Sequence, residues 1–270
     1  MILEDFSFID QVGKVLLFYA PSCASTQDLV FLCARQTGEK HPVALITFNQ
    51  THGRGQHQRA WISEPGKNLA MSVVLPLTHP AVDRLPLLNM AITLACVRAL
   101  QTMGINTHIK WPNDIRYQGA KLAGLLMEAH AAGPGKKSLC IGLGVNVNQK
   151  TFEISEQEVT ALINISHKEH NLMDLCHAIL KQLQVGWQQW EKASDDQQIL
   201  TQYQASLEGL NETWEITTDS PEHPLAVLKG VDAHGRIMLE IDGQTRTFHH
   251  GEIRLKKIVL HLRQKIKAHG

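Results

Sequence analysis

Four strand-like runs follow one another between residues 107 and 148 with only short turns between them, and this spacing constrains the fold more than any other feature. The runs are Thr107–Trp111, Ile115–Tyr117, Lys121–Ala129 and Ser138–Asn148, with a Gly/Pro turn at Gly133–Gly135 before the last one. Strands joined by such short turns pair as hairpins, because parallel pairing needs a crossover of a dozen or more residues. The sequence therefore predicts a mostly antiparallel sheet.

Two long helices are expected to pack on this sheet. The first runs from Pro86 to Met103, where Gly104 marks its end, and its apolar residues recur at helical spacing. The second follows the candidate N-cap Asn171 and presents an apolar stripe as far as Trp190. These helices and the hairpins predict an α+β domain.

The N-terminal part supplies further elements of the same domain. A short helix is expected from Thr26 to Arg35, with Ser25 or Thr26 as its N-cap. The expected strands around it are Val15–Ala20, Val43–Phe48 and Leu69–Leu75.

Beyond about Asn211 the pattern changes to short β-like runs. Turns are expected at Asp219–Pro221, at His234-Gly235 and at Asp242-Gly243. The runs are Glu215–Thr218, Leu225–Val231, Arg236–Ile241 and Arg246–His249. We therefore expect a separate small β-barrel or sandwich in residues 212–270, after a larger domain in residues 1–211.

Charge and cysteine content exclude several classes of function. The 270 residues include 26 Lys plus Arg and 26 Asp plus Glu, which gives a formal net charge of +0. The protein therefore lacks the diffuse positive field that non-specific nucleic-acid binding uses. The first apolar run, Val15–Ala20, is too short for a signal peptide or a membrane span. Five scattered cysteines without a CxxC pair indicate buried reduced thiols. We expect a cytoplasmic protein with no nucleic-acid partner, no membrane association and no built-in metal site.

The segment HGRGQHQRAW, residues 52–61, combines backbone freedom with positive charge. Gly53 and Gly55 let the chain turn and approach a ligand closely, while Arg54 and Arg59 can fork onto carboxylate or phosphate oxygens. Trp61 offers a flat face to an adenine or a cation. A mobile polar loop explains the same residues equally well, so this segment alone does not decide between a ligand site and a surface loop.

A second cluster lies in KWPNDI, residues 110–115, and KLAGLLME, residues 121–128. Pro112 ends a strand, so Asn113 and Asp114 lie in a turn, where they either bond the local backbone or face a ligand. Lys110 and Lys121 are expected on neighbouring strands at the edges of apolar segments, where a desolvated ammonium group needs an anion. A phosphate-bearing ligand would satisfy both lysines, although an ordinary Asx turn remains an alternative.

The strand IGLGVNVN, residues 141–148, alternates Gly142 and Gly144 with apolar residues, so one of its faces carries no side chains. Such a face admits a flat or slender ligand. The segment has no third glycine and precedes no obvious helix, which excludes the dinucleotide fingerprint. No P-loop, HExxH or GxSxG motif occurs in the sequence.

Taken in order, these segments resemble the biotin protein ligase family. The matching pieces are CASTQ (23–27), NQTHGRGQHQRAW (49–61), PGKNL (65–69), KWPNDI, KLAGLLME, IGLGVNVN and HGEIRLK (250–256). GRG followed by KWPND and KLAG is a highly specific combination, although each piece alone is not. The resemblance implies a catalytic domain of the type shared with lipoate ligases and class II aminoacyl-tRNA synthetases, with a mixed central sheet, and a small SH3-like β-barrel at the C-terminus.

The resemblance also implies an activity. Enzymes of this family use ATP to activate biotin as biotinyl-5′-AMP with release of pyrophosphate, and then transfer biotin to a lysine of a biotin carboxyl carrier protein or domain. Some members carry an N-terminal winged helix-turn-helix and act as repressors. Because the first catalytic strand is expected near Val15, we expect a ligase without repressor function. Dimers are frequent among bacterial relatives, which leaves a homodimer open.

Individual roles follow from the same resemblance. Arg54, Arg59 and Lys121 are the expected catalytic cations, since fixed positive charge stabilises the charge that builds up on the α-phosphate. The expected biotin contacts are Ser25, Thr26, Gln27, Gln50, Gly53, Arg54, Gly55, Gln56, Lys121, Gly124, Gly142 and Gly144. The expected ATP contacts are Arg54, Arg59, Trp61, Lys110, Asn113, Asp114, Lys121 and Asn146, with Asp114 also helping to place the Mg²⁺ that accompanies ATP.

Three positions depart from the family pattern or match it only in part. The frequent form GRGRxGR has an arginine where this chain has Gln56 and a glycine where it has Gln58. A glutamine loses the cation, so we expect the adenylate to be held less by charge here, under a loop that closes over it as a lid. Lys256 stands where some relatives have an arginine directed at the nucleotide.

Two other functions compete with biotin ligation. A lipoate or octanoate ligase of the related fold also uses a lysine and an acyl-adenylate, but KWPND and the tryptophan-closed arginine loop argue against it. A non-enzymatic biotin or nucleotide sensor would bind biotin without releasing pyrophosphate. A transcriptional regulator is disfavoured by the neutral charge and by the lack of a DNA-binding domain ahead of Val15.

Overall fold

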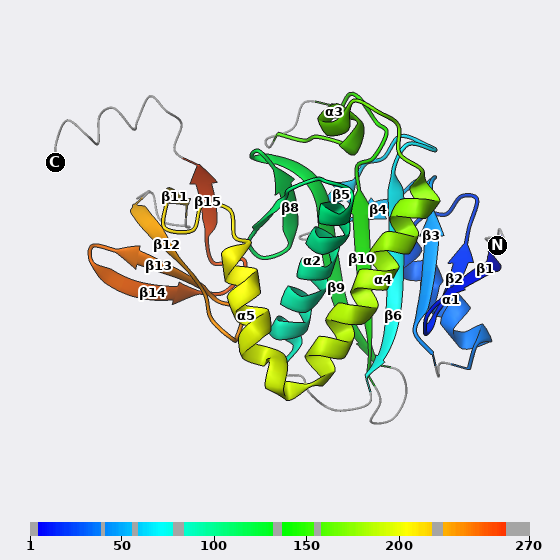
Figure 1. Ribbon diagram of the computed structural model, residues 1–270, viewed down its shortest axis with the longest axis horizontal. Coiled ribbons are helices and arrows are strands. Elements are labelled where there is room, and N and C mark those ends of the chain that lie inside the picture. The colour runs from blue at the N-terminus through cyan, green and yellow to red at the C-terminus, as the bar shows by residue number, and fades with distance from the viewer. Residues whose placement is uncertain are drawn as a thin grey trace.

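A mixed eight-stranded sheet forms the larger part of the computed structural model, and a five-stranded sheet forms the C-terminal part (Figure 1). The structure describes residues 5–38, 41–55, 59–77, 84–131, 137–153, 158–217 and 224–257. The predicted turns at Gly133–Gly135 and Asp219–Pro221 therefore lie outside the described residues.

The large sheet has the strand order β1-β2-β3-β6-β10-β9-β8-β7. Its strands are β1 (Ser7–Val12), β2 (Val15–Tyr19), β3 (Val43–Thr47), β6 (Leu69–Leu77), β7 (His108–Lys110), β8 (Asp114–Tyr117), β9 (Ala120–Ala131) and β10 (Lys137–Val145). Only β2 and β3 pair in parallel, and the other neighbours are antiparallel, which confirms the mixed, mostly antiparallel sheet.

Two long helices cover one face of this sheet, as the sequence predicts. They are α2 (Leu85–Thr102) and α4 (Leu172–Glu191), and they pack on strand residues such as Leu139, Ile141 and Leu143. The side chain of Asn171 accepts hydrogen bonds from the backbone of Met173 and Asp174 and so caps α4. Among the described helices, α2 has the length and hydropathy of a membrane span, but 67% of it is buried inside this core.

Among the described helices, α1 (Thr26–Gln36) packs on the opposite face of the sheet. Side chains alternate along a strand, so Cys140 points away from the α2 face and joins a second core with Leu29, Val30 and Cys33 of α1. The even-numbered residues that follow on β10 share this face, which we call the α1 face. All five cysteines are buried and free, which confirms the prediction of reduced thiols.

The C-terminal part is an open antiparallel sheet rather than a confirmed barrel. Its order is β14-β13-β12-β11-β15, from β11 (Thr213–Thr217), β12 (Leu225–Val231), β13 (Ile237–Ile241), β14 (Gln244–Phe248) and β15 (Arg254–Lys257). Within the described residues β14 and β15 are the two edges, so the predicted SH3-like closure is not confirmed. Trp214, Leu228 and Leu239 form its core.

The two sheets contact each other through Trp111 and Leu210. The indole nitrogen of Trp111 donates a hydrogen bond to the carbonyl of Gly235 at 2.9 Å, and Trp111 and Leu210 each pack against the cores of both sheets. The division into domains at residue 211 therefore stays a prediction, since the parts share packing residues.

Several short elements have no counterpart in the expected pattern. They are β1, β4 (Gly53–Arg54), β5 (Ala60–Trp61), α3 (Leu162–Ser166), a 3₁₀ turn (Ala193–Asp195), α5 (Asp196–Ala205) and β15. Strand β1 lies ahead of the expected first strand at Val15, and five of its six residues are exposed. An edge strand with so little burial carries no alternating apolar pattern to reveal it.

Candidate functional site

A row of small residues crosses the α1 face of the large sheet. Ala70 of β6 lies opposite Gly144 of β10, Gly144 opposite Gly124 of β9, Gly124 opposite Asp114 of β8, and Asp114 opposite Lys110 of β7. In this row, the three adjacent strands β6, β10 and β9 contribute no side chain larger than a methyl group. The row then ends in the carboxylate of Asp114 and the ammonium group of Lys110. This arrangement forms a flat floor bordered by charge.

Side chains from distant segments lie over the two glycines of β10. A Cβ built on Gly142 would lie 2.5 Å from Oε1 of Gln27, and one built on Gly144 would lie 2.7 Å from Cδ2 of Trp61 and closer still to two other ring atoms. Real Cβ atoms do not approach other atoms this closely. Gln27 and Trp61 therefore occupy space that exists only because these positions are glycines.

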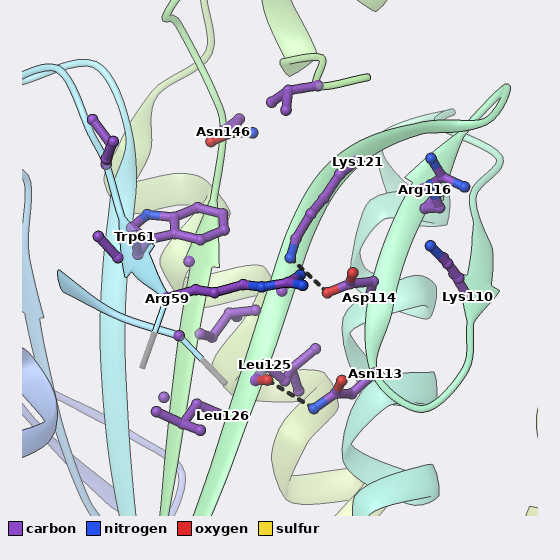
Figure 2. Close-up of a pocket in the computed structure, with 18 of the residues that line it drawn as sticks. Arg59, Trp61, Lys110, Asn113, Asp114, Arg116, Lys121, Leu125, Leu126 and Asn146 are labelled. Carbon is purple, nitrogen blue, oxygen red and sulfur yellow. Dashed lines mark hydrogen bonds and ion pairs between the residues drawn. The ribbon is translucent and has the colours of Figure 1, made fainter. Parts of the chain in front are cut away.

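Lys121 reaches the same face because of a register shift. Ile115 lies opposite Ala123, but Arg116 lies opposite Lys121, so Leu122 is an extra residue on β9. A bulge of this kind re-aims the side chains that follow it. The ammonium group of Lys121 lies 2.7 Å from Oδ1 of Asp114, above Gly124, and the two side chains are 18% and 25% exposed (Figure 2).

Lys110 and Lys121 do not lie on neighbouring strands, contrary to the sequence prediction. Strand β8 separates β7 from β9, because the short run at Ile115 forms the middle strand of the group. Burial lowers the pKa of Lys110, and so do the nearby cations of Arg116 and Lys121, whereas Asp114 and Glu208 oppose the shift. Both lysines nevertheless line one cavity.

The opposite end of the floor is polar but uncharged. Gln50 accepts a hydrogen bond from the backbone nitrogen of Thr26 at 2.8 Å and lies 3.2 Å from its hydroxyl group. The hydroxyl groups of Thr26 and Ser72 are 2.8 Å apart, and Ser72 donates to Oε1 of Gln27 at 3.0 Å. Ser25, Thr26, Gln27 and Ser72 are buried.

The arginine segment forms a small hairpin beside this end. Gly53 and Arg54 pair with Trp61 and Ala60, and the backbone nitrogen of Gly55 donates to the carbonyl of Arg59 at 2.7 Å. Its residues 56–58, including the predicted contact Gln56, lie outside the described residues. Figure 2 shows the Arg59 side chain extending across the cavity toward the Lys121–Asp114 pair.

Arg54 points to carboxylates. Its guanidinium group lies 2.7 Å from Oδ1 of Asp28 and 3.5 Å from Oε2 of Glu128. Two of the three expected catalytic cations, Arg54 and Lys121, are thus each paired with an acidic group.

Asn113 and Asn146 border the floor through backbone contacts. The amide of Asn113 donates to the carbonyl of Leu125 at 2.8 Å, and that of Asn146 donates to the carbonyl of Thr160 at 3.1 Å. The turn at Asn113 is fixed in this way to β9.

One cavity of about 1670 Å³ joins the polar end, the glycines Gly124, Gly142 and Gly144, and the Lys121–Asp114 pair. Of the predicted site residues, Gly53 lines instead a second cavity of about 750 Å³ on the arginine hairpin, and Gln56 is not described. The predicted residues that line the large cavity are Ser25, Thr26, Gln27, Gln50, Arg54, Gly55, Arg59, Trp61, Lys110, Asn113, Asp114, Lys121, Gly124, Gly142, Gly144 and Asn146. Lys256 of β15 lines it as well.

Sequence reasoning missed Ser72, Arg116 and Arg254, which also line the large cavity, and Glu128, which lines the second. Ser72 is a polar residue inside the apolar run Leu69–Leu75, and this interruption was the available signal. The other three read as ordinary solvent-facing strand residues, so no local signal identified them.

Comparison with known proteins agrees with this geometry. Residues 19–148 match the model of the Biotin/lipoate A/B protein ligase family. This segment is a biotin/lipoate ligase domain. It contains α1, the arginine hairpin and the complete floor from Ala70 to Gly144, so the family match covers the core of the candidate site.

Two relatives of this domain are named for their activities. The biotin–[acetyl-CoA-carboxylase] ligase of Mycobacterium tuberculosis is 26% identical over 78% of this chain and 78% of its own length. The bifunctional ligase/repressor BirA of Bacillus subtilis is 33% identical over 52% of this chain, and the match spans 43% of its own length.

Solved structures share the fold of the ligase domain and most of the rest of the chain. The biotin protein ligase of Aquifex aeolicus, in complex with biotin and ATP, superposes with a TM-score of 0.73 at 24% identity and covers 90% of this chain and 99% of that one. The Leishmania major enzyme in complex with biotinyl-5-AMP has a TM-score of 0.60 at 22% identity, covering 88% and 99%.

Proposed function

We propose that this protein is an ATP-dependent biotin protein ligase, which forms biotinyl-5′-AMP with release of pyrophosphate and then transfers biotin to a lysine of a biotin carboxyl carrier domain. One observation carries the proposal. A single cavity joins a neutral polar end, a side-chain-free floor and a cationic end in that order, and biotin has a neutral cyclic urea, a slender apolar tail and a carboxylate in the same order.

The neutral end suits a urea group because it offers hydrogen bonds without charge. Thr26, Gln50 and Ser72 present hydroxyl and amide groups that are already held in position by one another. Such preorganised groups lose little conformational entropy when a ligand binds. A charged ligand end would leave its charge unpaired in this part of the cavity.

The floor suits the tail. The row from Ala70 through Gly144 to Gly124 crosses three strands without a side chain larger than a methyl group, so it leaves room for a slender ligand beside the Trp61 and Lys121 side chains that lie over its glycines. The Trp61 ring over Gly144 supplies an apolar wall. Nζ of Lys121 lies over this ring, 5.8 Å from its centroid. In the proposed complex this ring packs near the adenine.

The cationic end brings together groups for the first chemical step. The biotin carboxylate attacks the α-phosphate of ATP, so two anions have to approach each other and negative charge accumulates on the phosphate oxygens. Lys121, with Arg59 extending toward it, supplies fixed positive charge at this position. Lys110 is a partly buried cation at the end of the same row, where the remaining phosphates would offset its desolvation.

Asp114 has two proposed tasks. One carboxylate oxygen holds the ammonium group of Lys121 over the floor. Mg²⁺ arrives with ATP as part of the substrate and is usually held by one or two carboxylates together with phosphate oxygens and water. The described residues contain no cluster of three or more His, Cys, Asp or Glu side chains that could hold a metal ion.

Arg54 has to exchange partners to act on the adenylate. Its contacts with Asp28 and Glu128 are partly exposed, with 45% of the Arg54 side chain accessible, and exposed ion pairs contribute only about 0–1 kcal/mol. A phosphate group can therefore displace a carboxylate at small cost. Closure of the arginine segment over the adenylate would exclude water and protect the mixed anhydride from hydrolysis.

The test is biotin-dependent exchange of pyrophosphate into ATP, followed by transfer of labelled biotin to a carrier domain. Lys121→Ala is expected to reduce the exchange rate by about 10²–10³, the effect of removing one preorganised group that stabilises transition-state charge. Lys229→Ala is the matched control, because Lys229 is also paired with an acidic residue but lies on the C-terminal sheet.

Three results would count against the proposal. Full exchange activity of Lys121→Ala would contradict the assignment of this residue. Exchange that depends on lipoate or octanoate instead of biotin would favour the related ligase activity, and biotin binding without exchange would favour a sensor. The absence of repressor function, the biotin carboxyl carrier domain as partner and the cytoplasmic location stay predictions from the sequence, which leaves a homodimer open.

A further inference from the structure

Glu128 is a shared acceptor that lines the second cavity, next to the neutral polar end of the large cavity. Its Oε2 atom accepts a hydrogen bond from Nε2 of Gln27 at 3.0 Å and lies 3.5 Å from the guanidinium group of Arg54. Nε2 of His130 lies 3.8 Å from the same oxygen. One carboxylate thus joins the start of α1, the arginine hairpin and the end of β9.

This carboxylate fixes the orientation of the Gln27 amide. An ionised carboxylate only accepts hydrogen bonds, so it binds the NH₂ side of Gln27 and turns Oε1 toward Ser72. The hydroxyl proton of Ser72 is then donated to Gln27, and the oxygen of Ser72 is left to accept from Thr26. The direction of hydrogen bonding across the neutral end therefore starts at Glu128.

The same contact fixes where the Gln27 side chain lies. Gln27 is 4% exposed, and its Oε1 lies over Gly142, only 2.5 Å from a Cβ built there. Its amide forms part of the wall at this end of the floor. If the amide swung away from Gly142, the cavity would lengthen and a ligand that fits it now would lose contacts.

We propose that Glu128 is a positioning residue for the proposed biotin site, holding Gln27 over Gly142 and fixing the donor and acceptor pattern offered to the neutral end of the ligand. The inference rests on the proposed function. Glu128 acts through Gln27 and contacts no reacting atom, and its contact with Arg54 also links this end to the arginine hairpin.

Two substitutions separate the charge of Glu128 from its hydrogen bond. Glu128→Met keeps the length and removes the acceptor, and we expect it to raise KM for biotin about tenfold, the lower end of the effect of a hydrogen bond to a charged group. Glu128→Gln keeps an acceptor oxygen, so its rise should be smaller. KM for ATP should change less than about twofold in both, since Arg54 keeps its closer partner Asp28 at 2.7 Å and the pair of Lys121 with Asp114 is unchanged.

Glu240→Gln is the matched control because Glu240 is an acidic strand residue of similar exposure, paired with Lys229 and remote from both cavities. Its KM values for biotin and ATP should equal those of the unmodified protein. A second measurement uses Gln27→Ala alone and together with Glu128→Met. If Glu128 acts through Gln27, the double variant should have the KM for biotin of Gln27→Ala alone.

An unchanged KM for biotin in Glu128→Met would overturn the inference. So would equal rises for biotin and ATP, which indicate general loosening of the fold, or multiplicative effects in the double variant. These results are distinct from failure of the proposed function, because that failure appears in the unmodified protein as the lack of biotin-dependent pyrophosphate exchange.

Discussion

Gly144→Ala adds one methyl group to the floor of the cavity, directly under the Trp61 ring. The new Cβ would lie 2.7 Å from Cδ2 of Trp61, whereas carbon atoms in contact are normally about 3.5–4.0 Å apart. Gly144 lies within a regular strand and is not among the residues with positive φ, so alanine fits its backbone conformation. The cost of the substitution therefore comes from the ring and not from the strand.

The ring has to withdraw by roughly 1 Å from its place over the strand. Overpacking of this kind costs about 1–3 kcal/mol of unfolding free energy. The effect on activity should be larger in proportion, because a misplacement of about 1 Å near reacting groups can reduce a rate about a hundredfold. We expect adenylation to fall by about that factor, while the protein stays folded.

Urea unfolding gives the stability change, and biotin-dependent pyrophosphate exchange gives the rate. Trp61→Leu with and without Gly144→Ala is the decisive comparison, since removing the ring removes the overlap. The alanine should then cost much less stability in the Trp61→Leu background than in the native one. A native exchange rate and native stability for Gly144→Ala alone would refute the placement of the ring over Gly144.

Two further predictions concern ion pairs outside the floor. Glu208→Gln should lower the unfolding free energy by about 3–5 kcal/mol, measured by urea unfolding, because it leaves the guanidinium group of Arg116, whose side chain is only 10% exposed, without its carboxylate at 3.1 Å. Burial opposes ionisation of Asp232, but hydrogen bonds from Arg236 outweigh it and lower its pKa below 3.8. Because the folded pKa is the lower one, this stabilisation is present above about pH 4 and lost as the pH falls further, so Asp232→Asn should unfold with a weaker pH dependence below that value; an unchanged acid dependence would contradict this.

The floor of the site could be predicted because it depends on local pattern. Alternation of apolar residues and glycines in residues 141–145 fixes both a strand and the face that carries no side chains, since side chains alternate with a period of two. The short spacing from Lys110 to Lys121 likewise leaves hairpins as the only pairing. These features need no knowledge of what packs on the sheet.

The position of Lys121 could not be predicted from the same period. Lys121 and Gly124 are three residues apart, so regular alternation assigns them to opposite faces of β9. The extra residue Leu122 shifts the register and brings Lys121 to the face of Gly124, where it meets Asp114. A bulge arises from the fit between two strands, and no residue in KLAG signals it.

The covering side chains depend on even longer range contacts. Gln27 reaches Glu128, 101 positions along the chain, and Trp61 reaches Gly144 from the arginine hairpin. Sequence similarity identified Gln27 and Trp61 as site residues, but it gave no reason for the glycines beneath them other than space for a ligand. In this structure the same glycines also make room for the protein's own side chains.

The ion pairs of this region differ in how deeply their side chains are buried, and their expected roles differ accordingly. The side chains of Arg116 and Glu208 are 10% and 8% exposed, so breaking their ion pair leaves an uncompensated buried charge. This pair therefore holds β8 in place whether or not a ligand is bound. The pair of Arg54 with Asp28 is 45% and 66% exposed, so its net contribution is small and an anion can replace the carboxylate. Lys121 and Asp114 are intermediate, which suits a cation that must stay over the floor and still turn toward a phosphate. Each of these cations has a carboxylate partner within the protein. In the proposed function, an anionic ligand would replace the most exposed of these carboxylates, while the buried pair keeps β8 fixed.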